Sequence, residues 1–307
     1  MIFTEKITIA ALAPFHFELS AEIFADGDKQ IRIYEDGRFR QIVRADDKLI
    51  LATVESKGTI DEPKLCAELK SDRPRTLDDK KKAEETISVL FNLNFDLTPF
   101  YEEVKKDKVM AFLTQNLRGL KSPTTPTVFE ALVDSIVEQQ ISLKVANGIE
   151  NKLIKKFGDA VSLEGDVYFV YPTPQALASA SIEELRKCGL SFRKSECIKS
   201  ISALVMEGEL DLEKLKNKAS NEEIIRELDS LKGVGVWTAE LTMLRGMQRL
   251  DALPAEDLGL RRVISHFYCG EKGITSMEAR QIARDWGRWK GLAAYYLIVA
   301  EMLGIQI

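Results

Sequence analysis

The chain has 307 residues, 45% hydrophobic and 30% charged, which is the composition of an ordinary globular protein with room for two domains. Its formal net charge of −5 argues against a protein that coats nucleic acid non-specifically, although a local basic face is still possible. The sequence holds only two histidines, His16 and His266, and its four cysteines form no CxxC pair. A multi-histidine metal centre, a zinc ribbon and a compact iron–sulfur loop are therefore excluded, and we expect the reduced thiols of an intracellular protein.

Two apolar stretches raise the question of a membrane or secretory segment. The run at residues 7–12 follows Glu5 and lacks a clear cleavage site, so we expect no signal peptide. The run at residues 291–304 contains Glu301 and is shorter than the roughly twenty residues that span a bilayer. We predict that it forms a buried core helix and that the protein does not bind membranes.

The first hundred residues predict a small α+β unit. Apolar and polar residues alternate over residues 31–54 as they do in strands, and Asp36-Gly37 provides a two-residue hairpin turn. A polar run over residues 71–82 then leads into a helix-like segment that contains Ile87 and Leu90.

From about residue 100 the apolar period becomes helical, which predicts a domain of many short helices. Residues 121–126 are predicted to form a linker. Capping-box signatures follow it at Thr127/Glu130, Ser181/Glu184, Ser220/Glu223 and Thr275/Glu278. The only block with a clear positive charge is residues 231–300, with ten basic and seven acidic side chains.

The most informative motif is residues 231–239, LKGVGVWTA, where Gly233, Val234 and Gly235 join two helical segments. Free backbone N–H groups of such a turn, together with the positive end of the following helix, form a site suited to a phosphate. The alternative is that Gly-Val-Gly merely connects two packed helices.

Together with Leu-Arg-Gly at 244–246 and Leu253 to Arg262, this motif resembles the helix-hairpin-helix DNA glycosylases, and more narrowly their 3-methyladenine glycosylase II type. The resemblance covers residues 98–307 and includes 129–142. Residues 1–97 are less specifically similar to that type's TATA-binding-protein-like antiparallel sheet domain. The fold it implies is mostly α, with an N-terminal α+β domain at 1–97 and the helical glycosylase region at 98–307.

The resemblance implies that Asp257, 22 residues after Gly235, is catalytic. Breaking an N-glycosidic bond builds positive charge on the sugar, which a nearby carboxylate stabilises while it orients or deprotonates water. Asp257 could instead simply cap the helix that begins at Leu258, and the two roles are compatible. Its neighbour Glu256 reads as a solvated charge.

Two departures from the family pattern narrow the subtype. Bifunctional members carry a nucleophilic lysine where this chain has Trp237, which implies a monofunctional enzyme without lyase activity. No cysteine follows Cys269, so the iron–sulfur loop of another branch is absent. We expect no zinc and no catalytic metal, although a monovalent cation could bridge hairpin carbonyls and phosphate.

Aromatic side chains available for a base pocket are Trp237, Tyr295 and Tyr296. Trp286 and Trp289 are spaced as core residues. A related enzyme has a tryptophan in its last helix where the approximate match here is Ile298, so the lining of the pocket is left open.

Further contacts to DNA are predicted on both sides of the hairpin. Gln140 matches the side chain that fills the gap left by an extruded nucleotide, or else it is an interior polar residue. The other predicted contacts are Gln139, Thr238, Arg193, Lys194 and Arg261, of which the charged ones could equally be solvated.

The sequence therefore predicts a monofunctional glycosylase that flips alkylated purines out of double-stranded DNA and hydrolyses their glycosidic bonds. The alternatives are an enzyme of the same fold for 8-oxoguanine or a deaminated base, and a helix-hairpin-helix module that binds DNA without chemistry. We expect a monomer, cytoplasmic in a prokaryote or nuclear in a eukaryote.

Overall fold

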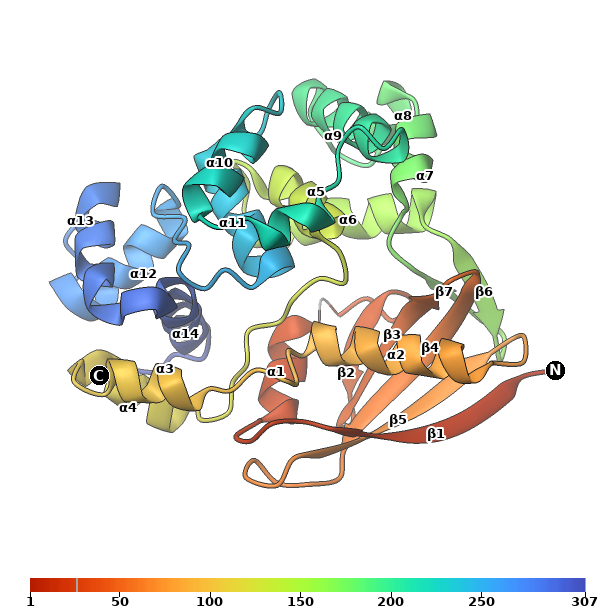
Figure 1. Ribbon diagram of the computed structural model, residues 1–307, viewed down its shortest axis with the longest axis horizontal. Coiled ribbons are helices and arrows are strands. Elements are labelled where there is room, and N and C mark those ends of the chain that lie inside the picture. The colour runs from red at the N-terminus through yellow and green to blue at the C-terminus, as the bar shows by residue number, and fades with distance from the viewer. Residues whose placement is uncertain (26, 307) are drawn as a thin grey trace.

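An antiparallel sheet forms the N-terminal part of the computed structural model, which describes residues 1–25 and 27–306 (Figure 1). Its five strands run in the spatial order β1-β5-β4-β3-β2. They are β1 (Phe3–Ala10), β2 (Arg32–Glu35), β3 (Arg38–Ala45), β4 (Lys48–Ser56) and β5 (Lys64–Ser71). The helices α1 (Phe17–Phe24) and α2 (Leu77–Leu90) pack on one face and bury an apolar layer that includes Phe39, Val43 and Phe91.

The alternation over residues 31–54 correctly predicted β2, β3 and β4. Asp36 and Gly37 have φ angles of 52° and 73°, the left-handed pair that a tight hairpin turn between β2 and β3 requires. The sequence did not reveal β1 or β5, although the two strands pair along their full length, from Phe3 opposite Ser71 to Ala10 opposite Lys64.

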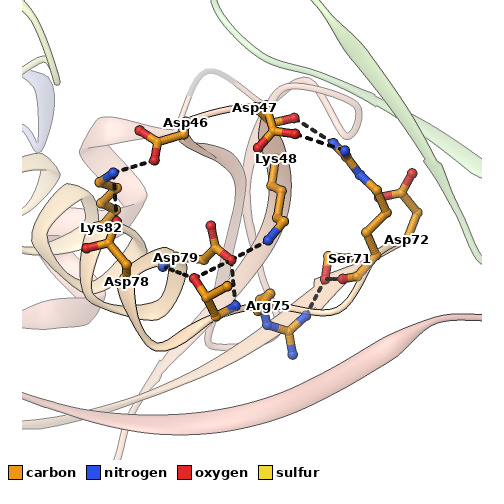
Figure 2. Close-up of polar contacts among 11 residues, drawn as sticks. Asp46, Asp47, Lys48, Ser71, Asp72, Arg75, Asp78, Asp79 and Lys82 are labelled. Atoms are coloured by element: carbon orange, nitrogen blue, oxygen red, sulfur yellow. Dashed lines mark hydrogen bonds and ion pairs between the residues drawn. The ribbon is translucent and has the colours of Figure 1, made fainter.

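Hydrogen bonds and ion pairs connect the start of α2 to the turn between β3 and β4 (Figure 2). Thr76 and Asp79 form a capping box, which the sequence analysis overlooked. The Asp79 carboxylate also accepts a hydrogen bond from Lys48 Nζ at 2.5 Å, and this ammonium, with the Thr76 N–H, lowers the pKa of Asp79 to about 2. Lys82, one turn later, pairs with Asp46 and Asp78.

The helical region contains two apolar cores rather than one. The first is built by α5 (Val128–Glu138), α6 (Leu143–Phe157), α7 (Pro174–Ser179), α8 (Ile182–Lys187), α9 (Phe192–Met206), α10 (Asn221–Asp229) and α11 (Val236–Met247), with the 3₁₀ helix η1 (Glu213–Asn217). The second is built by α3 (Thr98–Val104), α4 (Lys108–Asn116), α12 (Leu258–Cys269), α13 (Ser276–Ile282), η2 (Ala283–Trp289) and α14 (Lys290–Met302). The chain thus returns to the α3–α4 segment after leaving it (Figure 1).

The buried residues also show where the chain passes from the core of the sheet to the second helical core. The last residue of the sheet core is Leu93, and the second helical core begins at Leu97. The predicted core helix at 291–304 is confirmed as α14, whose Tyr296 and Leu297 are fully buried. Within residues 1–25 and 27–306, no helix has the length and apolarity needed to cross a membrane.

The region after residue 100 consists of many short helices, as predicted, but it also contains two strands that the sequence analysis did not predict. Two short strands, β6 (Ala160–Leu163) and β7 (Asp166–Phe169), form a hairpin that lies beside the sheet and packs on part of its second face (Figure 1). Val161, Leu163 and Tyr168 pack there on Ile42 and Leu51. Four residues per strand are too few to show a clear alternation, and only the turn at Glu164-Gly165 was a local signal.

The predicted helix starts are all present, but two differ in detail. Ser181 and Thr275 form complete capping boxes with their glutamates. The Thr127 and Ser220 side chains accept the expected backbone N–H. The Glu130 and Glu223 side chains do not accept the N-cap backbone N–H, so these two capping boxes are incomplete.

Candidate active site

The helical hairpin consists of α10, a turn at residues 230–235, and α11. Gly233 has φ +93°, and a Cβ there would lie 3.0 Å from the Cys197 sulfur of α9, so glycine is needed for both conformation and space. Gly235 is different: its backbone is extended and a Cβ would meet nothing within 4 Å. Gly233 therefore shapes the turn, while Gly235 leaves its outer surface open.

The start of α11 is the part of the hairpin able to bind an anion. The helices α5 to α10, α12 and α13 each begin with a side chain that accepts a backbone N–H, but α11 begins at Gly235 with no such cap. Its first N–H groups therefore lack an acceptor on the N-cap side chain, and they lie at the positive end of the helix dipole. An exposed, uncapped helix start of this kind suits a phosphate oxygen.

Asp257 lies within hydrogen-bonding distance of this hairpin. Trp237, in the first turn of α11, donates its indole Nε1–H to Asp257 Oδ2 at 3.1 Å. The other oxygen, Oδ1, accepts the backbone N–H of Leu260 at 2.8 Å, so Asp257 is also the N-cap of α12. The carboxylate is half-buried and each of its oxygens has one donor, which fixes its plane while leaving lone pairs free.

Arg280 of α13 holds the segment that precedes Asp257. Its guanidinium pairs in bidentate fashion with the buried Glu240 of α11, at 2.9 and 3.0 Å, and donates to the Leu253 carbonyl at 3.0 Å. It also donates to Glu256 Oε2 at 2.8 Å; Glu256 is exposed, as predicted for a surface charge, and in addition pairs with Arg280. These bonds tie the loop before the carboxylate to both α11 and α13.

No local pattern in the sequence marked Arg280 or Glu240, because the ion pair joins residues forty positions apart. Burial raises the pKa of Glu240, and the adjacent Arg280 acts in the opposite direction. A buried carboxylate with a bidentate arginine is costly to leave unpaired, so the pair constrains how α11 and α13 can move apart.

The loop after α5 is joined to the hairpin through Gln139. Its side-chain Nε2 donates to the Gly233 carbonyl at 3.0 Å and to Thr238 Oγ1 at 2.9 Å. Gln140, the next residue, is exposed and has φ +57°. Gln139 thus binds protein, and Gln140 is the one of the two that is presented to solvent.

The remaining predicted DNA contacts divide into exposed and engaged side chains. Arg193 is exposed. The side chains of Val234 and Thr238 are buried, and the Val234 N–H already donates to the Leu231 carbonyl at 3.0 Å, so the structure does not support a side-chain contact of either residue with DNA. Arg261 is half-buried and donates to the Ile274 carbonyl at 3.3 Å, and Lys194 donates to two backbone carbonyls.

The aromatic residues predicted to line the base pocket lie in different environments. Tyr296 is fully buried, and its hydroxyl donates to the Leu120 carbonyl at 2.8 Å and contacts the Tyr101 hydroxyl. The structure therefore assigns it to the core and corrects its placement in a base pocket. Tyr295 is half-buried, with a hydroxyl that has no hydrogen-bond partner among the described residues. Trp286 and Trp289 are core residues, as predicted.

A separate cavity lies away from these residues. It has a volume of about 710 Å³ and separates β3 from the start of α5 and the segment around Tyr171. Burial raises the pKa of Glu130, one of its lining residues, to about 8. Neither Trp237 nor Asp257 borders this cavity.

Comparison with known proteins identifies this arrangement. Residues 133–288, which include Gln139, the hairpin and Asp257, match the family described as HhH-GPD superfamily base excision DNA repair protein. The chain belongs to this superfamily of DNA glycosylases. It is 32% identical to a DNA-3-methyladenine glycosylase of Bacillus subtilis, over 70% of this chain and 72% of that one.

The similarity to solved structures extends to the N-terminal sheet. A 3-methyladenine DNA glycosylase from Archaeoglobus fulgidus superimposes with a TM-score of 0.83 at 26% identity, covering 98% of this chain and 99% of that one. The Schizosaccharomyces pombe 3-methyladenine DNA glycosylase Mag1, solved with abasic DNA, gives a TM-score of 0.57 at 27% identity, over 68% of this chain and 99% of that one. The predicted fold, a sheet domain followed by a helix-hairpin-helix region, is thereby confirmed.

The contact between Trp237 and Asp257 predicts a specific effect of mutation. Trp237→Phe keeps an aromatic ring but removes the N–H that donates to Oδ2. A hydrogen bond to a charged group contributes about 1.5–3 kcal/mol, so we expect single-turnover base release to slow by about tenfold or more. Affinity for an abasic-site duplex and the melting temperature should change little. An unaltered rate would show that this bond does not position the carboxylate.

Proposed function

We propose that this protein is a monofunctional DNA glycosylase that removes alkylated purines, of the 3-methyladenine and 7-methylguanine type, from double-stranded DNA. The observation that carries the proposal is the Trp237–Asp257 contact at the uncapped start of α11. It puts one carboxylate and one large aromatic face next to a phosphate-binding helix end. The similarity to 3-methyladenine glycosylases supports the choice of substrate.

The reaction that we propose uses the charge already present on the substrate. An N-alkylated purine carries a formal positive charge and leaves without a proton donor at its ring. The Asp257 carboxylate stabilises the positive charge that develops on the sugar, and it orients the water that attacks the sugar carbon. The bond electrons leave with the purine, which departs as a neutral base, while the water adds to the sugar carbon and gives one proton to the Asp257 carboxylate, so that an abasic site remains.

Selection of the base follows from the same few groups. Stacking of an electron-poor ring on Trp237 gives a cation–π contact of about 0.5–2 kcal/mol, which distinguishes charged from neutral bases by about tenfold. Weakened stacking of the lesion within the duplex adds to this selectivity when the base flips. Tyr295, whose hydroxyl has no hydrogen-bond partner within residues 1–25 and 27–306, is the second side chain that we propose for the pocket. We expect broad specificity for N-alkylated purines.

We further propose that the enzyme has no lyase activity. A lyase needs an amine nucleophile at the sugar, and the only side-chain donor to Asp257 among the described residues is the Trp237 indole. Hydrolysis without a lysine adduct requires no metal in this scheme. A monovalent cation at the hairpin would share carbonyls that already accept hydrogen bonds, such as that of Gly233.

A panel of matched duplexes tests both proposals. We expect release of 7-methylguanine and 3-methyladenine, slow release of hypoxanthine and little release of 8-oxoguanine, with strand breaks appearing only after alkali. Borohydride should trap no covalent protein–DNA adduct. Faster release of 8-oxoguanine than of 3-methyladenine would overturn the substrate assignment, and a trapped adduct would overturn the mechanism. The Asp257→Asn variant, purified in parallel, controls for contaminating glycosylases.

A further inference from the structure

Lys194 lies in the first turn of α9, where its ammonium group is directed at another helix. Its Nζ donates to the carbonyl of Val137 at 2.9 Å and to that of Gln139 at 2.6 Å. Both acceptors belong to the C-terminal end of α5, which closes at Gln139. A cation at this end of a helix binds carbonyls that have no partner within the helix and opposes the negative end of its dipole.

The same residue, Gln139, also joins α5 to the hairpin. Its carbonyl accepts from Lys194, while its side chain donates to Gly233 and Thr238. Glu138, immediately before it, pairs with Arg245 of α11 at 2.5 Å. Three elements, α9, α5 and α11, therefore meet at the two residues that precede Gln140.

Gln140 needs this support because of its backbone. Its φ of +57° is left-handed, a conformation that residues other than glycine rarely adopt and that persists where the surroundings impose it. The residue is exposed and begins a segment in which Ile141, Leu143 and Val145 are exposed as well.

We propose that Lys194 is a positioning residue, which holds the end of α5 so that Gln140 is presented to the gap left by a flipped nucleotide. This inference rests on the proposed function. It replaces the expectation that Lys194 contacts a DNA phosphate. Arg193, the neighbouring exposed residue, keeps that role.

The surroundings of Lys194 agree with this assignment. The side chain is half-buried, and no carboxylate among the described residues pairs with it. Burial lowers the pKa of Lys194, as expected for an ammonium enclosed by protein rather than held in solvent for a polyanion. A phosphate contact would require its Nζ to leave at least one of the two carbonyls or to use only its third proton.

The salt dependence of DNA binding distinguishes the two roles. Each phosphate contact contributes about 0.9 to the slope of log K against log salt concentration. We expect Lys194→Met to keep the wild-type slope on an abasic-site duplex. Arg193→Met, the matched control at the neighbouring residue, should lower the magnitude of the slope by about 0.9, the value for one phosphate contact. A slope that falls as much for Lys194→Met as for Arg193→Met would overturn the proposal.

Coupling to Gln140 provides the second readout. The fluorescence of a 2-aminopurine placed beside an abasic-site analogue reports the flipping equilibrium. We expect Lys194→Met and Gln140→Ala each to lower the equilibrium constant for flipping by about tenfold, which would be seen as a smaller fluorescence change. The double variant should lose little more than either single variant. Additive losses would show that Lys194 does not act through Gln140.

If Lys194→Met disturbs the fold, a neutral variant that can still donate a hydrogen bond replaces it in both measurements. Lys194→Gln should keep the salt slope and retain part of the coupling, while a phosphate ligand would lose the slope on becoming neutral. Neither readout depends on base release. Failure of the wild-type enzyme to release any base would therefore count against the proposed function, and the slope and coupling would still decide the role of Lys194.

Discussion

Asp257→Asn should retain the fold and DNA binding while base release falls by about 10²-fold or more, the scale of losing an electrostatic contact made in the transition state. Asparagine caps helices about as well as aspartate does, so the bond from the Leu260 N–H to the side chain at position 257 can persist. The variant removes the negative charge without removing the cap. Single-turnover release of 7-methylguanine under saturating enzyme measures the effect.

The control for this experiment is Asp251→Asn, an exposed acid in the loop before Asp257. It changes the net charge equally and should leave the rate near that of the wild type. Affinity of both variants for a duplex with an abasic-site analogue should stay close to the unmodified value. Near-normal release by Asp257→Asn would remove this residue from the mechanism and leave it only the role of capping α12.

The second large effect is expected at Gly235. An aspartate there adds a charge in the open space beside the uncapped start of α11, where a phosphate oxygen would bind. Two negative charges about 4 Å apart repel by about 4 kcal/mol at an effective dielectric constant of about 20, which corresponds to roughly a thousandfold loss of affinity. Duplex titration of Gly235→Asp at fixed salt concentration tests this, and normal binding would exclude the hairpin as the phosphate site.

Two further variants separate charge from shape at the hairpin. Gly235→Asn has nearly the same size as the aspartate but is neutral, so it should bind DNA much more tightly than Gly235→Asp. Gly233→Ala should instead lower the melting temperature, because φ is +93° and the new methyl group would press on Cys197. Destabilisation by Gly235→Asp as large as by Gly233→Ala would show that its binding defect comes from unfolding.

Local chemistry explains which features the sequence alone could determine. A glycine turn, an N-cap and a hairpin turn each depend on residues within a few positions of one another, so Gly233, Gly235, Asp257 and the Asp36-Gly37 turn were identified from spacing. The role of Asp257 as the cap of α12 was likewise predicted and is confirmed. The family resemblance added the catalytic interpretation of that residue.

Tertiary structure decided what depends on partners distant in the sequence. The bond from Trp237 to Asp257, the pairing of β1 with β5, and the β6–β7 hairpin on the sheet all join segments whose proximity no local pattern encodes. An aromatic residue at helical spacing faces a core or a cleft according to which helices pack beside it. Tyr296 was therefore misassigned and Trp286 was not.

The same reason separates charged residues that look alike in the sequence. Arg193 and Lys194 are adjacent, yet one is exposed and the other binds the end of α5, because successive residues of a helix point in directions about 100° apart. The sequence alone identified the glycine hairpin and the carboxylate that follows it. Only the packing of α5, α9, α11 and α12 decided which side chains bind protein and which remain free for DNA.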